Sequence, residues 1–157
     1  MSEPTFSGVT VADAIGFVAG HRKKGCGCPC CGQYVKEYGR SIHTRMALVL
    51  VALHKHFLAT PGLEWLHVSK FPANERFNSN GDYNYLRHWG LLEPHPQFVG
   101  HWRITELGHQ FVRGEARVPR KVFLFNNERI GASDETISIQ DALGSEFTYE
   151  ALMADAA

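Results

Sequence analysis

All four cysteines of this 157-residue chain lie within six residues, in the stretch GCGCPCCGQ at residues 25–33. The centre of that stretch, CPCCG, spaces Cys28 and Cys31 as Cys-x-x-Cys, with a proline after the first thiol and a glycine after the second. A turn of this kind directs two thiolates toward one metal ion, and glycine tolerates the backbone conformation that follows. We therefore interpret Cys28 and Cys31 as two ligands of a structural zinc site.

A tetrahedral zinc site requires two further ligands, and the chain has no second Cys-x-x-Cys. Cys26 is the nearest candidate, and His21 follows, on the last turn of the helix expected before it. A second copy of the chain is another source of ligands, and so are the more distant histidines His43, His67, His95 and His101.

Other uses of these thiols agree less well with the sequence. Adjacent cysteines such as Cys30 and Cys31 do not link distant segments, which argues against a disulfide framework. A thioredoxin-like redox pair lacks its βαβ surroundings, and four ligands this close would strain an iron–sulfur cubane. A catalytic zinc needs acids or bases beside it, and Glu37 is the only acid nearby. Unliganded reduced thiols, as in a degenerate zinc site, stay open as an alternative.

The charges of the chain are unevenly distributed along it. Residues 1–130 carry all 16 Lys and Arg against ten Asp and Glu, whereas residues 131–157 carry six acids and no Lys or Arg. A basic body suits nucleic acid, and Arg22, Lys23 and Lys24 before the cysteines are candidates for phosphate contacts. The acidic tail also contains apolar residues, so we expect it to dock on the body or on a partner chain.

The periodicity of apolar residues and the helix-capping residues predict an α+β fold with four main helices. Thr10, Ser41, Ser79 and Thr105 begin these helices, which we expect at residues 10–24, 41–57, 79–89 and 105–115. Residues 62–71 fit either a short helix or a strand. Residues 101–104 fit a strand, residues 118–133 a hairpin turning at Asn126-Asn127, and Ser138 and Thr148 begin two short helical segments.

Apolar spacing also predicts which helix faces are buried. Val11, Ile15 and Val18 share one face of the first helix. The second helix is apolar nearly all round, as expected of a central core helix. In the third helix we expect Tyr83, Leu86 and either Tyr85 or Trp89 to face inward.

Two segments, YLRHWGLLEP at 85–94 and HWRITELGHQFV at 101–112, resemble the winged helix-turn-helix fold. In that fold the recognition helix often ends on Leu-x-x-x-Gly-Leu-Leu, and the wing hairpin returns to an aromatic-x-Ile-Thr-x-x-Gly. The resemblance implies that the helix at 79–89 lies in the DNA major groove, with outward residues that read bases. Those residues would be Asn80, Asn84, Arg87 and His88. The expected wing, EPHPQFVG, carries no Lys or Arg.

The knuckle, a Trp-Gly-Leu at 89–91, a Trp-Arg-Ile-Thr at 102–105 and a valine-rich hairpin occur together in this chain. In this combination the whole chain resembles small uncharacterised phage and prophage proteins. That resemblance implies the cytoplasm of a bacterial host as its location. The longest apolar run, MALVLVAL at 46–53, is shorter than the roughly 20 residues of a membrane span, so we expect no membrane contact.

These observations predict an N-terminal helix and zinc-knuckle loop at 1–40, a winged-helix-like core at 41–115, and a hairpin with an acidic helical tail at 116–157. The predicted function is a small DNA-binding accessory or regulatory protein with a structural zinc ion. The alternative is a protein-interaction module that binds or inhibits a host protein, and a homodimer is compatible with either. The chain has no Ser-His-Asp arrangement, Walker loop or HExxH motif, so we predict that it is not an enzyme.

Overall fold

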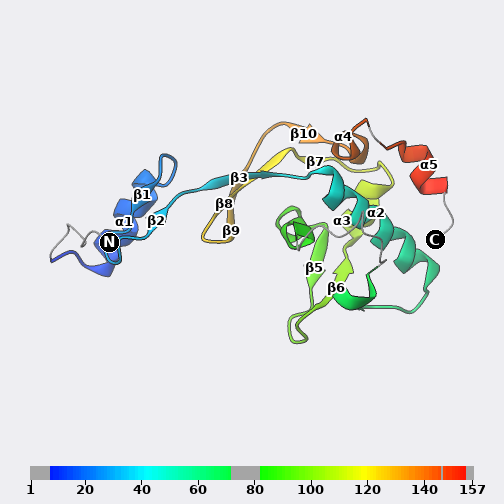
Figure 1. Ribbon diagram of the computed structural model, residues 1–157, viewed down its shortest axis with the longest axis horizontal. Helices are drawn as coiled ribbons and strands as arrows, with labels where there is room; N and C mark the ends of the chain where they lie inside the picture. Colours follow the sequence, from blue (N-terminus) through cyan, green and yellow to red (C-terminus); the bar gives the residue numbers. More distant parts are fainter. Residues whose placement is uncertain (1–7, 72–81, 146, 155–157) are drawn as a thin grey trace. The chain divides into compact units, whose positions relative to one another are not determined.

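A computed structural model describes residues 8–71, 82–145 and 147–154 (Figure 1). The chain divides into two compact units. The first unit combines the part up to Arg40 with Phe123–Gly131, and the second combines Ser41–Val122 with the part from Ala132 onward. Helices and strands both contribute, so the fold is α+β as the sequence predicts. Among the described residues, no helix is both long and apolar enough to cross a membrane.

The first unit opens with helix α1 (Val11–His21), and its start is fixed as predicted. The Thr10 hydroxyl accepts a hydrogen bond from the Asp13 amide, and the Asp13 carboxylate accepts one from the Thr10 amide. These two bonds satisfy amides that the first helical turn leaves without intrahelical partners. The helix ends three residues earlier than predicted, and Gly25 then adopts a left-handed φ of 91°. The chain turns there into the cysteine segment.

The segment after this turn takes part in two β-structures. Strand β1 (Cys26–Gly27) pairs with β2 (Tyr34–Val35) in an antiparallel hairpin. A three-stranded sheet has the order β3 (Tyr38–Ser41), β8 (Lys121–Phe125), β9 (Glu128–Ala132). The predicted turn between the last two is confirmed, because Asn126 and Asn127 both have positive φ, at 51° and 61°, as a tight hairpin turn requires.

The second unit is built on helix α2 (Thr44–Ala59), which is buried nearly all round as predicted. Its predicted start was wrong, since His43 and not Ser41 precedes the first turn, and the His43 side chain makes no capping hydrogen bond. Ser41 instead ends strand β3. The pairing of that strand with β8 keeps the backbone extended for longer than the local capping signal indicates.

A three-stranded sheet packs beside α2, in the order β4 (Leu66–His67), β6 (His101–Ile104), β5 (Leu92–Pro94) (Figure 1). The ambiguous segment at 62–71 holds both structures proposed for it, because β4 continues into the 3-10 turn η1 (Val68–Lys70). A longer 3-10 helix, η3 (Asp82–Trp89), precedes β5, and helix α3 (Glu106–Val112) follows β6.

The acidic tail docks on its own unit, which decides between the two alternatives left open by the sequence. Strand β10 (Thr136–Ile137) pairs with β7 (Val118–Pro119), and α4 (Ile139–Leu143) begins at the predicted cap, Ser138. In the last helix, α5 (Tyr149–Ala154), the Tyr149 hydroxyl donates to the Val112 carbonyl at 2.7 Å. Lys55 Nζ donates to the Leu152 carbonyl at 2.8 Å.

Gly108 explains the Thr-x-x-Gly pattern at the start of α3. The Thr105 hydroxyl accepts a hydrogen bond from the Gly108 amide and donates one to the Gly90 carbonyl. A Cβ atom at position 108 would lie 2.3 Å from the Leu91 carbonyl oxygen and 2.6 Å from Ile104 Cγ1. Only glycine therefore lets α3 approach the start of β5 this closely.

We expect Gly108→Ala to lower the free energy of unfolding by about 2 kcal/mol or more, as overpacking against backbone does. All three tryptophans lie in the second unit, so urea denaturation followed by Trp fluorescence reports on it. Gly16→Ala, in the first unit, should leave this transition unchanged, because a Cβ there meets nothing within 4 Å. An unchanged midpoint in Gly108→Ala would show that α3 shifts without cost.

A histidine pair, of which His54 is buried and His109 half-buried, joins α2 to α3. His54 is 1% exposed, and its Nδ1 lies 2.8 Å from Nδ1 of His109. Burial, followed by the positive charges that His109 and Arg113 carry, lowers the pKa of His54 to about 4. Burial also lowers the pKa of His109. One ring donates and the other accepts, so the pair is stable in its neutral form.

Acid is expected to destabilise the second unit through His54. Because the pKa of His54 is lower in the folded chain than in the unfolded chain, its contribution is present at neutral pH and is lost as pH falls from about 6.5 toward 4. This linkage amounts to about 2 kcal/mol between pH 7.5 and pH 5. Urea denaturation across that range measures it. His54→Gln should make the free energy of unfolding less dependent on pH in this range, whereas His56→Gln on the same helix should leave that dependence unchanged.

Candidate metal centre and nucleic-acid interface

The CPCCG segment forms a closed knuckle at the end of the β1–β2 hairpin. The Cys28 amide donates to the Gln33 carbonyl at 2.8 Å, and the Gly32 amide donates to the Cys28 carbonyl at 2.8 Å. Gly32 has a left-handed φ of 75°, which is the conformation that the glycine after the second cysteine was expected to supply. The turn is therefore closed by hydrogen bonds and a glycine that all lie within residues 28–33.

The knuckle favours the ionised form of one thiol. Hydrogen bonds from the backbone N–H of Cys30 and then of Cys31 lower the pKa of Cys28, and the Cys31 thiol adds to the effect. Burial, and then the charge on Cys28, raise the pKa of Cys30. Since the thiolate is the metal-binding form, these amide-to-sulfur bonds prepare Cys28 as a ligand. The two thiols are of the ligand type that zinc binds, but they are two of the four ligands that a structural site needs.

The other predicted zinc ligands are not gathered at the knuckle. His21 Nδ1 lies 2.7 Å from the Phe17 carbonyl oxygen, and its ring stacks on Phe17. Cys26 is a strand residue opposite Val35. Across the described parts of the chain, no three Cys, His, Asp or Glu side chains form a group that could hold a metal ion. Zinc thus stays a prediction that rests on two thiols.

The more distant histidines have local partners within the second unit. His43 Nε2 lies 2.9 Å from the Asp82 carboxylate, and His67 Nδ1 lies 2.8 Å from the Ser69 hydroxyl. His95 Nδ1 accepts hydrogen bonds from the backbone amides of Gln97 and Phe98, and it thereby shapes the loop between β5 and β6. His101 stacks edge-on against His67.

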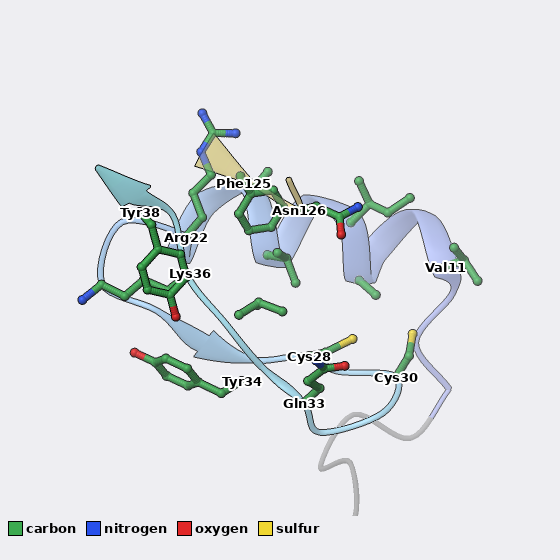
Figure 2. Close-up of a pocket in the computed structure, with 15 residues that line it drawn as sticks. Val11, Arg22, Cys28, Cys30, Gln33, Tyr34, Lys36, Tyr38, Phe125 and Asn126 are labelled. Carbon is green, nitrogen blue, oxygen red and sulfur yellow. The ribbon is translucent and has the colours of Figure 1, made fainter. Parts of the chain in front are cut away.

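A groove that the sequence did not reveal lies within the first unit, between α1 and the knuckle (Figure 2). Its volume is about 620 Å³. Cys28 and Cys30 lie toward one end of it, and Arg22, Lys36 and Tyr38 lie toward the other. Val11 and Ile15, expected to be core residues, are 69% and 65% exposed. The apolar face of α1 was the available signal, but its burial was wrongly assumed.

The basic residues beside the knuckle differ in their availability. Arg22 Nε lies 3.3 Å from Glu37 Oε2, so part of its charge is already compensated. Lys23, Lys24 and Lys36 are exposed. The two lysines that follow α1 are therefore better candidates for phosphate contacts than Arg22.

The segment expected to read DNA is wound as a 3-10 helix rather than an α-helix in its described part, η3. With three residues per turn, residues three apart align on one face. Tyr83, Leu86 and Trp89 form the inward stripe. Of the two residues that the sequence left as alternatives, Trp89 and not Tyr85 is buried. The Trp89 indole donates to the Pro119 carbonyl at 2.9 Å. This stripe anchors η3 against the unit.

Asn84 and Arg87 form a second stripe on η3, and both are exposed. His88 is half-buried on the third stripe, together with Asp82, whose carboxylate faces His43. Asn80 and the predicted cap Ser79 lie outside the described residues. Of the four predicted base-reading residues, two therefore share one exposed face.

No protein-family model, curated protein or solved structure matches this chain.

The knuckle turn provides a test that does not depend on metal. Gly32→Ala forces a side chain into a left-handed conformation, which costs about 1–2 kcal/mol. We expect amide hydrogen exchange at Cys28 and at position 32 to accelerate by about tenfold. Gly27→Ala is the control in the same hairpin, because its Cβ would make only an ordinary contact at 3.7 Å. Equal exchange rates in the two variants would mean that the turn does not need glycine.

Proposed function

We propose that this chain binds duplex DNA through a winged-helix unit within residues 41–115. The order of elements supports the proposal: helix α2, strand β4, helix η3, a β5–β6 hairpin, and helix α3 after a Thr-x-x-Gly. The β5–β6 hairpin, at one edge of the sheet β4–β6–β5, packs against η3, as a wing would. The chain would act as a small accessory or regulatory protein in the cytoplasm of a bacterial host, as its resemblance to phage proteins suggests.

The exposed stripe of η3 carries the proposal. Asn84 and Arg87 stand one 3-10 turn apart on an exposed face, about 120° around the helix from the buried stripe. Asparagine pairs with the edge of adenine, and arginine pairs with the edge of guanine, when a helix enters the major groove. The buried side chains of Leu86 and Trp89 anchor η3 to the rest of the second unit. Asn84 and Arg87 would therefore contact DNA from a helix whose position is fixed.

Phosphate contacts would come mainly from the first unit. Lys23 and Lys24 are exposed on the chain that leaves α1, and Lys36 lies on the other side of the knuckle hairpin. Contacts of this type are independent of sequence and weaken with salt. A structural zinc ion in the knuckle would hold these lysines in place without taking part in base reading.

We expect Arg87→Ala to weaken DNA binding by about 1–3 kcal/mol if the arginine contacts guanine. Fluorescence anisotropy with labelled random duplexes, followed by selection of preferred sites, measures the loss at low and moderate salt. The selected sites should bind the variant with reduced sequence preference, since a base contact is removed.

Arg120→Ala is the matched control for this experiment. It removes the same charge from the same unit, but Arg120 Nε pairs with Glu135 at 3.0 Å. Equal affinities for wild type and Arg87→Ala would remove η3 from the proposed interface. Absence of binding by the wild type at low salt would overturn the DNA proposal for the isolated protein.

A protein-docking function is the second candidate, and the wing tip favours it. Phe98 is 59% exposed and Val99 is 95% exposed, in a loop whose sequence from 93 to 102 has no Lys or Arg. Apolar residues presented by a loop that His95 rigidifies suit a protein partner better than a phosphate backbone. A host protein is the partner expected if the DNA titration is negative.

A further inference from the structure

We infer that the knuckle is half of a zinc site that a second copy of this chain completes, with one Zn²⁺ held by Cys28 and Cys31 of each copy. The inference rests on the predicted zinc ion but not on DNA binding. On this inference, the two-thiol knuckle of each chain lies at the interface between two copies.

The first step is the supply of ligands. All four cysteines and all nine histidines belong to the described residues. The first unit holds one histidine, His21, whose Nδ1 bonds to the Phe17 carbonyl of its own helix, and among the described residues it forms no group of three ligands with the cysteines. Its acidic side chains near α1 also have partners, Asp13 in the cap of α1 and Glu37 with Arg22. A structural zinc site needs four ligands, and the knuckle supplies two.

Cys26 is poorly placed as a third ligand from the same chain. It lies in β1, paired with Val35, two residues before Cys28. Among the described residues, Cys26 does not form a group of three metal ligands with the knuckle thiols. Cys28 and Cys31 are the better pair, because the turn between them is closed by the hydrogen bond from the Gly32 amide to the Cys28 carbonyl.

The surface beside the thiols is suited to a second copy. The Cys28 and Cys30 side chains border the groove whose other wall is α1, and Val11 and Ile15 stand uncovered on that helix (Figure 2). A chain that brings its own knuckle to this face would remove these apolar side chains from water as it closes the metal site. A two-fold axis through the zinc ion makes the two halves identical.

The small core of the first unit gives a reason for such a site. Of its described residues, only Ala14 and Leu124 belong to the buried hydrophobic core. A body of roughly 40 residues seldom folds stably without metals, disulfides or oligomerisation. A shared zinc ion would provide both a metal and an oligomer, and the reduced thiols would be its ligands.

The experiment uses the full-length, reduced protein after removal of metal with a chelator. Zn²⁺ is added in steps while light scattering on a sizing column measures the mass. We expect the mass to double from the 17.6 kDa of one chain, with saturation at half an equivalent of zinc per chain. Chelator should reverse the change. Co²⁺ in place of Zn²⁺ should give thiolate-to-cobalt absorption that saturates at the same half equivalent.

Cys28→Ser and Cys31→Ser should each abolish the zinc-dependent doubling, whereas the matched control Cys26→Ser should dimerise as the wild type does. Circular dichroism checks that the variants fold, and the stoichiometry of the wild type stands independently of them. One zinc ion per single chain would overturn the inference, as would a chain that binds no zinc or a dimer that persists with chelator. None of these readouts involves DNA, so failure here and failure of the proposed function are separable.

Discussion

The burial of helix α2 is the constraint on which the second unit depends. From Met46 to Val51 every side chain of α2 is buried, so the helix needs apolar partners on several sides at once. Helices η3, α3 and α4 supply them, and β6 packs beside them. A helix with a single apolar face would fix one neighbour, whereas this one fixes the positions of η3 and of strand β6 together. The geometry of the proposed DNA-reading face is thus a by-product of core packing.

Signals that act within a few residues could be predicted from the sequence. The caps at Thr10, Thr105 and Ser138 and the turn at Asn126-Asn127 all depend on side chains and φ angles of their immediate neighbours. The start of α2 could not be predicted in this way. Ser41 carries a capping side chain, but it is held in a strand by pairing with a segment some 80 residues later, and no local pattern records that pairing.

The candidate sites also differ in whether local or distant contacts determine them. The knuckle turn could be predicted from CPCCG, because its hydrogen bonds and its amide-to-sulfur contacts all lie within residues 28–33. The 3-10 winding of η3 selects Trp89 over Tyr85 as the inward residue, and it depends on contacts with α2 and with the Pro119 carbonyl. The uncovered face of α1 was missed for the opposite reason. Its spacing is that of a buried helix, and periodicity does not say whether a partner is present.

The docking of α5 changes how charge is divided within the molecule. Helix α5 is held by the Tyr149 hydroxyl and by the Lys55 ammonium on a carbonyl, whereas Glu135 and Asp141 of the tail pair with Arg120 and Arg117. The tail carboxylates count toward the second unit, which carries ten Lys and Arg against twelve Asp and Glu, whereas the first carries six against four. The protein is electrically neutral as a whole, but its first unit has a net charge of +2 and its second a net charge of −2. At low ionic strength the positive unit of one molecule attracts the negative unit of another, and added salt screens that attraction within a Debye length of about 10 Å.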